Sequence, residues 1–232
     1  MRRTWIVGLF VGVVALATGC TSGGSASTAN LPAASTLLAS AGNSARSVSS
    51  VHFSIVVNGT LAGVPIQNAD GDLNSRGQAK GSAKIALLGQ LTQVDFVLVN
   101  RTFYIKGPTG GYQKIAASLA GSLFDPTAIL DPNRGIAKVL TQTQGAQTQS
   151  RESVNGVDCY RITGKVDKGV VSALIPGIGQ NVDATLWVSA DSKNLPVKAE
   201  FVVPGSGGSQ GATVDVTFSN VNQPVTVTAP AG

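Results

Sequence analysis

Long stretches of this sequence alternate between apolar and polar residues, which is the pattern of strands with one buried and one solvent-exposed face. The alternation begins at Val51 and returns over residues 83–106. If the second stretch is three strands joined by two-residue turns at Gly89-Gln90 and Asn100-Arg101, its apolar side chains share one face. The pattern therefore predicts an antiparallel meander with one side in contact with water.

This register places individual side chains. Lys84 is expected directly opposite Asp95, which would be a favourable cross-strand charge pair. His52 is expected on the outer face of its strand, away from the core. The shared apolar face would consist of Phe53, Ile55, Ala83, Ile85, Leu87, Val94, Phe96, Leu98 and Phe103.

Helical patterns interrupt the strands. Residues 31–48 carry apolar side chains at three- and four-residue spacing, which predicts a helix ahead of the first strand. Asp125-Pro126 and Asp131-Pro132 each fit an N-cap followed by proline in the first turn, so two short tandem helices are expected. A further short helix is expected over residues 167–175. The apolar positions of the tandem helices are Ile129, Leu130, Ile136, Val139 and Leu140.

Strands resume after the tandem helices, and Asn155-Gly156 has the composition of a tight hairpin turn. The expected strands cover residues 150–154, 157–166, 184–188, 197–203, 213–218 and 225–228. This order of elements predicts an α+β fold, with one long antiparallel sheet and short helices gathered on one of its faces. Because aromatic residues make up only 5% of the chain, the core would be mainly aliphatic. Periodicity leaves open whether the apolar faces form a solid core or line a cavity.

The N-terminal segment has the features of an export signal. Arg2 and Arg3 precede an apolar run of about thirteen residues, shorter than the roughly 20 that a membrane-spanning helix needs. The sequence around Cys20 resembles the lipobox, whose cysteine receives a diacylglycerol. We therefore expect a signal peptide at 1–19, a lipidated Cys20 with a flexible tether at 20–32, and one folded domain at 33–232. The alternative is an ordinary secreted protein that is cleaved nearby.

Composition argues against several classes of function. One His and two Cys leave little material for a metal site, and no metal or cofactor is expected. Beyond the signal segment, 15 basic residues face 12 acidic residues, and the resulting +3 gives no nucleic-acid footprint. No motif or paired acids indicate catalysis, so the chain is not expected to be an enzyme. Cys159 is expected to be a small buried hydrophobe.

Seven segments, in order from about residue 35 to the C-terminus, carry a family resemblance. They are Ser50-Val51-His52-Phe53, Gly71-Asp72-Leu73, Gly81-Ser82-Ala83-Lys84-Ile85, residues 125–136 (DPTAILDPNRGI), Val154-Asn155-Gly156-Val157, residues 161–166 (RITGKV) and Ala184-Thr185-Leu186-Trp187-Val188. With them the chain resembles the LppX/LprAFG lipoproteins of mycobacteria and related actinobacteria, and is most similar to the LprF and LprG branches.

The resemblance implies a sheet curved as a half-barrel over helices, similar to the LolA/LolB carriers, around a hydrophobic cavity. This cavity would hold the acyl chains of phosphatidylinositol mannosides, lipoarabinomannan, triacylglycerol or phthiocerol dimycocerosate. The protein would move such lipids from the inner membrane toward the outer envelope. Ala83 matches a family position on the cavity wall where a bulky residue would obstruct acyl chains. The apolar sheet face and the apolar helix positions given above would form the lining.

The resemblance also bears on location and partners. The protein would be a monomer that Cys20 anchors at the outer face of the cell membrane, with acylated lipids as ligands and a membrane transporter as a further partner. The alternative is a non-catalytic interaction or accessory module for a membrane transporter or a sensor kinase. An apolar cavity would favour the carrier, and a solid core with an exposed apolar patch would favour the module.

Overall fold

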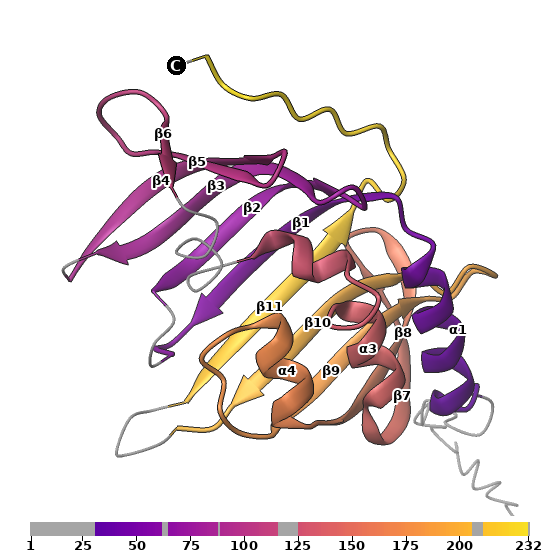
Figure 1. Ribbon diagram of the computed structural model, residues 1–232. Coiled ribbons are helices and arrows are strands. Elements are labelled where there is room, and N and C mark those ends of the chain that lie inside the picture. The colour runs from indigo at the N-terminus through magenta and orange to yellow at the C-terminus, as the bar shows by residue number, and fades with distance from the viewer. Residues whose placement is uncertain (1–30, 62–64, 88, 116–124, 206–210, 232) are drawn as a thin grey trace, which may run out of the picture.

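The computed structural model describes residues 31–61, 65–87, 89–115, 125–205 and 211–231. Eleven strands form one antiparallel sheet in the order β6-β5-β4-β3-β2-β1-β11-β10-β9-β8-β7 (Figure 1). The strands are β1 (Ser50–Asn58), β2 (Ile66–Asn74), β3 (Gln78–Leu87), β4 (Gln90–Val99), β5 (Thr102–Lys106), β6 (Gln113–Ile115), β7 (Gln144–Val154), β8 (Val157–Val166), β9 (Val182–Ser189), β10 (Pro196–Val203) and β11 (Ala212–Ser219).

In the part of the chain that the structure describes, four short helical elements pack on one face of this sheet, which curves around them as a half-barrel (Figure 1). They are α1 (Ala34–Arg46), the 3₁₀ helix η2 (Pro126–Leu130), α3 (Ile136–Gln142) and α4 (Lys168–Leu174). The first strand lies at the centre of the sheet because β1 pairs with β2 on one side and with β11 on the other. The α+β class and the single curved sheet are confirmed. Among the described residues, no helix has the length and apolar character needed to cross a membrane.

Small residues form the middle of the inner face of β2 and β3, between Leu73 on one side and Ile66 and Ile85 on the other. Gly71 and Gly81 pair directly across the two strands. On either side of them, Phe53 of β1 pairs with Gly71, and Phe96 of β4 pairs with Gly81. A Cβ atom built on Gly81 would meet the carbonyl oxygen of Asp70 and would lie 2.7 Å from the Cα of Gly71. The two backbones therefore approach too closely at this row for any side chain.

The predicted meander is correct in its faces and wrong in one register. Leu87 pairs with Gln90, so the turn falls one residue earlier than expected, with Gly89 at φ +80°. As a result, Lys84 lies opposite Gln93 rather than Asp95. The error amounts to two residues along the ladder, and an even shift leaves every side chain on its predicted face.

Both other tight turns are confirmed. Asn100 and Arg101 have φ values of +51° and +59°, as a type I′ turn requires, and Asn155-Gly156 joins β7 to β8 with φ values of +51° and +80°. His52 lies on the outer face of β1, as predicted. There its ring nitrogens lie 2.9 Å from Asp72 Oδ1 and 3.3 Å from Asp70 Oδ2.

Three predictions of elements need correction: two elements begin elsewhere, and one does not form. The second tandem helix begins at Ile136, because Asp131 and the residues after it form a turn instead of a first helical turn. The strand expected at 150–154 begins at Gln144, since an edge strand needs no apolar alternation to pair on one side. Residues 225–228 form no strand. Instead, Val225 and Val227 pack with Val97 and Val99 on the outer face of the sheet.

Candidate functional site

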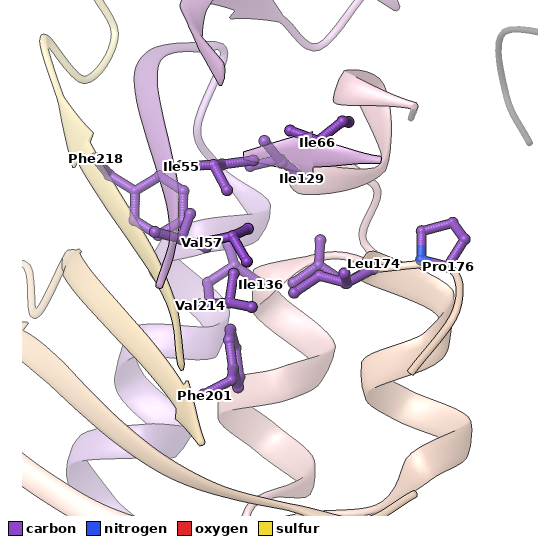
Figure 2. A pocket seen from close by; sticks show the side chains of 12 residues that line it. Ile55, Val57, Ile66, Ile129, Ile136, Leu174, Pro176, Phe201, Val214 and Phe218 are labelled. Carbon is purple, nitrogen blue, oxygen red and sulfur yellow. The ribbon is translucent and has the colours of Figure 1, made fainter. Parts of the chain in front are cut away.

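An apolar cleft lies between the inner face of the sheet and the helices (Figure 2). Strands β1, β2, β10 and β11 form one wall, and η2, α3 and the end of α4 form the other. The lining side chains are Ile55, Val57, Ile66, Ile129, Ile136, Leu174, Ile175, Pro176, Phe201, Val214, Val216 and Phe218. All of these side chains are hydrocarbon, so the described lining can hold an apolar ligand by burial alone and offers no side-chain hydrogen bond to a polar one.

The walls of the cleft lie close together. About 600 Å³ between them is free of protein atoms, counting the space open to solvent, and the cavity within it measures about 30 Å³. A single water needs roughly 10–15 Å³. In this structure the cleft is therefore too narrow for an extended hydrocarbon chain.

The residues expected to line a cavity fall into three groups in the structure. Ile55, Ile129 and Ile136 line the cleft itself. Other members are part of the continuous core beside it: Phe53, Ala83, Ile85, Val94, Phe96, Phe103, Val139 and Leu140 are buried, and Leu98 and Leu130 are half-buried against them. The side chain of Leu87 and the whole of Cys20 lie outside the described residues.

Sequence reasoning missed the part of the lining that comes from the C-terminal half. Phe201 of β10 and the β11 residues Val214 and Phe218 reach the cleft because β11 pairs with β1. The alternation in β11 already indicated which of its side chains face inward. The missing information was the pairing itself, which joins segments about 160 residues apart in the sequence.

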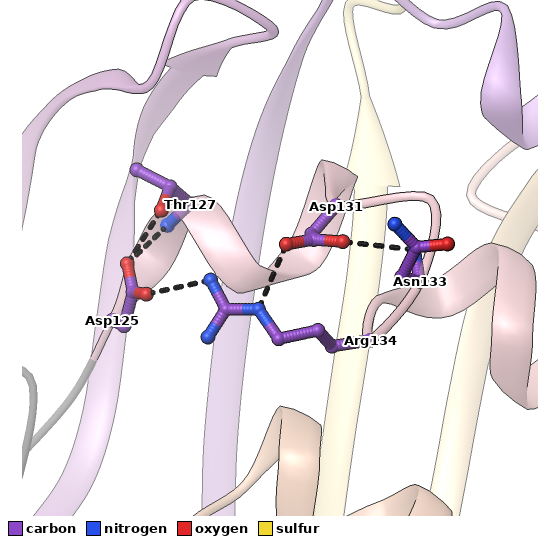
Figure 3. A network of polar contacts seen from close by, with 5 residues as sticks. All are labelled: Asp125, Thr127, Asp131, Asn133 and Arg134. Carbon is purple, nitrogen blue, oxygen red and sulfur yellow. Dashed lines mark hydrogen bonds and ion pairs between the residues drawn. The ribbon is translucent and has the colours of Figure 1, made fainter.

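A polar network fixes the helical wall that carries Ile129 (Figure 3). Asp125 caps η2 by accepting hydrogen bonds from the backbone N–H of Thr127, at 3.0 Å, and from its hydroxyl, at 2.6 Å. Arg134 donates from Nη2 to Asp125, at 3.0 Å, and from Nε to Asp131, at 2.8 Å. The guanidinium thereby joins the start of η2 to the turn that follows it.

The network also sets the protonation of its central carboxylate. Burial acts to raise the pKa of Asp131, but the hydrogen bonds from Arg134 and from the backbone N–H of Asn133 outweigh it, and the pKa falls below its usual 3.8. Asp131 is therefore more readily ionised in the folded chain than in the unfolded chain. Its contribution to stability is present above pH 3.8 and is lost as the pH falls through the lowered pKa.

We expect Arg134→Gln to destabilise the fold by about 1 kcal/mol at neutral pH, since two half-exposed ion pairs are lost. The difference from wild type should shrink as the pH falls below 3.8 and through the lowered pKa, where Asp131 becomes protonated in wild type as well. Urea unfolding at neutral and acidic pH measures both effects. A difference that stays constant with pH would show that the arginine acts by packing and not through its charge.

The outer face of the sheet holds a second, smaller apolar cluster around Cys159. The thiol is fully buried together with Trp187 and Val197. Burial raises the pKa of Cys159 to about 11, and the nearby carboxylate of Asp158 adds to the increase. A thiol in this state is a poor nucleophile.

We expect Cys159 to react with a maleimide or a disulfide reagent about 100-fold more slowly in the folded protein than in urea, because far less thiolate is present at neutral pH. Peptide mapping after timed labelling identifies the modified residue. Equal rates in the two states would mean that this outer cluster opens freely. Among the residues that the structure describes, no three His, Cys, Asp or Glu side chains form a group suited to a metal ion.

Comparisons with known proteins agree on one family. The model of the LppX_LprAFG lipoprotein family matches residues 33–227. The lipoarabinomannan carrier protein LprG of Mycolicibacterium hassiacum is 33% identical over 237 residues, covering 99% of this chain and 98% of its own. LprF of Mycobacterium tuberculosis, named as a candidate transporter of diacylated glycolipids, is 30% identical over 87% of this chain and 79% of its own.

Solved structures show the same fold. The crystal structure of LprF from Mycobacterium bovis has a TM-score of 0.75 at 27% identity, covering 86% of this chain and 97% of its own. The lipoprotein LppX of Mycobacterium tuberculosis, at 21% identity and a TM-score of 0.64, covers 84% of this chain and 98% of its own, and supports the fold alone. The sequence match and the curved sheet lead to the same conclusion: the chain belongs to the LppX_LprAFG lipoprotein family.

Proposed function

We propose that this protein is a lipid carrier, which holds the acyl chains of a cell-envelope lipid or glycolipid between its sheet and its short helices. The observation that carries the proposal is the all-hydrocarbon lining of the cleft. The names of the relatives, a lipoarabinomannan carrier and a candidate glycolipid transporter, support this class of ligand. Phosphatidylinositol mannosides, lipoarabinomannan and triacylglycerol are the lipids to test.

The carrier would act by binding and release, with no covalent step. Moving a hydrocarbon chain out of water contributes about 0.8 kcal/mol per CH₂ group. A bilayer offers nearly the same environment, so a chain that leaves the membrane for the cleft gains little net free energy. An apolar cleft without polar anchors therefore favours exchange of lipid over permanent storage.

We further propose that Cys20 carries the acyl groups that anchor the protein, after removal of residues 1–19, and that residues 20–32 tether the domain 33–232 to the membrane. In this arrangement the protein works as a monomer at the outer face of the cell membrane and passes lipid toward the outer envelope. A membrane transporter would be the partner that supplies or accepts the lipid.

Native mass spectrometry of the full-length gene product from a mycobacterial host tests the carrier function. We expect a stoichiometric adduct whose fragments identify a diacylated or triacylated lipid. A protein that is purified without detergent, is folded by circular dichroism and carries no lipid even after incubation with envelope lipids would overturn the proposal. The accessory-module alternative would then be the better one.

A further inference from the structure

The ladder of strand pairs gives the half-barrel two distinct ends. Val57, Val214 and Phe201 pair in one row, and all three line the cleft. Strands β1 and β10 finish just beyond this row, and β2 and β11 begin there. The β3–β4 turn lies at the same end, because Ile85 of β3 pairs with the cleft residue Ile66. We call this the cleft end, and the opposite one the far end.

Charge is distributed unequally between the two ends. Among the described residues that connect β1 to β2, α4 to β9 and β10 to β11, none is Asp, Glu, Lys, Arg or His. Of the charged residues next to these connections, Lys165 pairs with Asp183 at 2.5 Å, Asp167 caps α4, and Lys168 is exposed. The connections at the far end, in contrast, expose Arg76, Arg101, Asp191 and Lys193.

An exposed leucine stands beside the turn at the cleft end. Leu91, in the hairpin between β3 and β4, has 56% of its surface exposed, more than any other large apolar side chain among the described residues. The residues directly before it, Gly89 and Gln90, carry no charge. An uncharged, leucine-bearing tip is costly in water and suits the boundary between lipid headgroups and acyl chains.

The course of the N-terminal chain points to the same end. The carbonyl of Pro32 accepts a hydrogen bond of 2.8 Å from the Thr148 hydroxyl, and Thr148 pairs with Ile162. That row of the ladder continues through β9, β10 and β11 to Ile55, inside the cleft. From there α1 runs about 20 Å toward the far end, so Pro32 lies on the cleft side of this helix (Figure 1).

Dimensions allow an anchor on this side. The five strand spacings between β7 and β1 amount to about 24 Å along the sheet. A Gly/Ser-rich chain of the twelve residues from Cys20 to Pro32 spans about 20 Å. A bilayer that holds Cys20 is thus within reach of the cleft end, whereas the far end is separated from it by the full length of α1.

We propose that the cleft end is the surface by which this protein docks on a lipid bilayer, with Leu91 at the level of the headgroups. The occupant of this apolar end is the membrane and not a protein. The docking rests on the proposed anchoring by Cys20, and the proposed carrier function is needed only for direct loading of lipid from the docked position.

A pair of introduced cysteines tests the docking. Val157, in the β7–β8 hairpin at the far end, is also exposed, at 40%, and serves as the matched position. Full-length Leu91→Cys and Val157→Cys proteins, purified from a mycobacterial host and labelled with an environment-sensitive fluorophore, are reconstituted into vesicles of phosphatidylcholine and phosphatidylglycerol. Lipids with brominated acyl chains should quench the label at position 91 and leave position 157 unaffected. Equal quenching at both positions, or stronger quenching at 157, overturns the proposal.

A second pair of variants separates docking from carrying. Leu91→Asp should slow uptake of a fluorescent diacylglycerol from these vesicles about tenfold, while Val157→Asp leaves it unchanged. Both substitutions are at exposed sites, so thermal unfolding should match wild type. If wild type takes up the diacylglycerol and Leu91→Asp takes it up at the same rate, docking through this end is contradicted. Quenching of the label on Leu91→Cys, together with a wild-type protein that takes up no lipid, supports the docking and contradicts the carrier function.

Discussion

Loss of the lipid adduct is the expected result of replacing Val57 by Trp, whereas Val56→Trp should leave the adduct in place. The two residues are neighbours on β1 and point to opposite faces of the sheet. Val57 lines the cleft, and Val56 is 41% exposed on the outer face. The indole would occupy the narrow space between the walls, and we expect lipid occupancy in native mass spectrometry to fall at least about tenfold. Similar adducts in both variants would contradict binding in this cleft.

Ala83→Trp extends the same experiment toward the part of the sheet to which the family resemblance assigns the cavity wall. Ala83 is buried between Ala69 and Val94, beside the cleft rather than in its lining. Reduced occupancy in a variant that unfolds at the wild-type temperature would show that the cavity extends under β3 when lipid is bound. Unchanged occupancy would confine the ligand to the space between β1, β11 and the helices.

The faces of the sheet could be predicted from the sequence because they depend only on local alternation. Phe96 and Phe103 were placed on the inner face despite the wrong pairing of Lys84, since a shift of two residues along a ladder preserves the faces. The same reasoning failed at residues 225–228, which alternate as a strand would. Pro224 and Pro230 flank this segment, and it packs on the outer face instead of extending the sheet.

The candidate site was only partly predictable, for a physical reason. Ile55, Ile129 and Ile136 could be found because short-range patterns, a strand alternation and Asp-Pro caps, orient them. Phe201 and Phe218 depend on the pairing of β11 with β1, which no local period encodes. The width of the cleft could not be predicted from the sequence either, because it depends on how closely two walls of similar composition pack.

The close approach of β2 and β3 leads to the largest effect that we expect on stability. Gly81→Ala should lower the free energy of unfolding by about 3 kcal/mol or more, since its methyl group would meet backbone atoms of Asp70 and Gly71 and lie 2.9 Å from the ring of Phe96. Backbone atoms cannot rotate out of the way as a flexible side chain can. The strands would have to separate, which breaks ladder hydrogen bonds at the centre of this half of the sheet. Urea unfolding measures the loss.

Gly179→Ala is the matched control, because a methyl group there would meet nothing within 4 Å and the backbone has no left-handed conformation. It should be neutral or slightly stabilising, since alanine reduces the freedom of the unfolded chain. A neutral Gly81→Ala would mean that the two strands can move apart at little cost. The small residues on the inner face of β2 and β3 would then serve to leave room for a ligand, and Gly81→Ala should reduce lipid occupancy without affecting stability. Measuring both quantities on the same variant therefore decides whether this row of glycines shapes the sheet or the cavity.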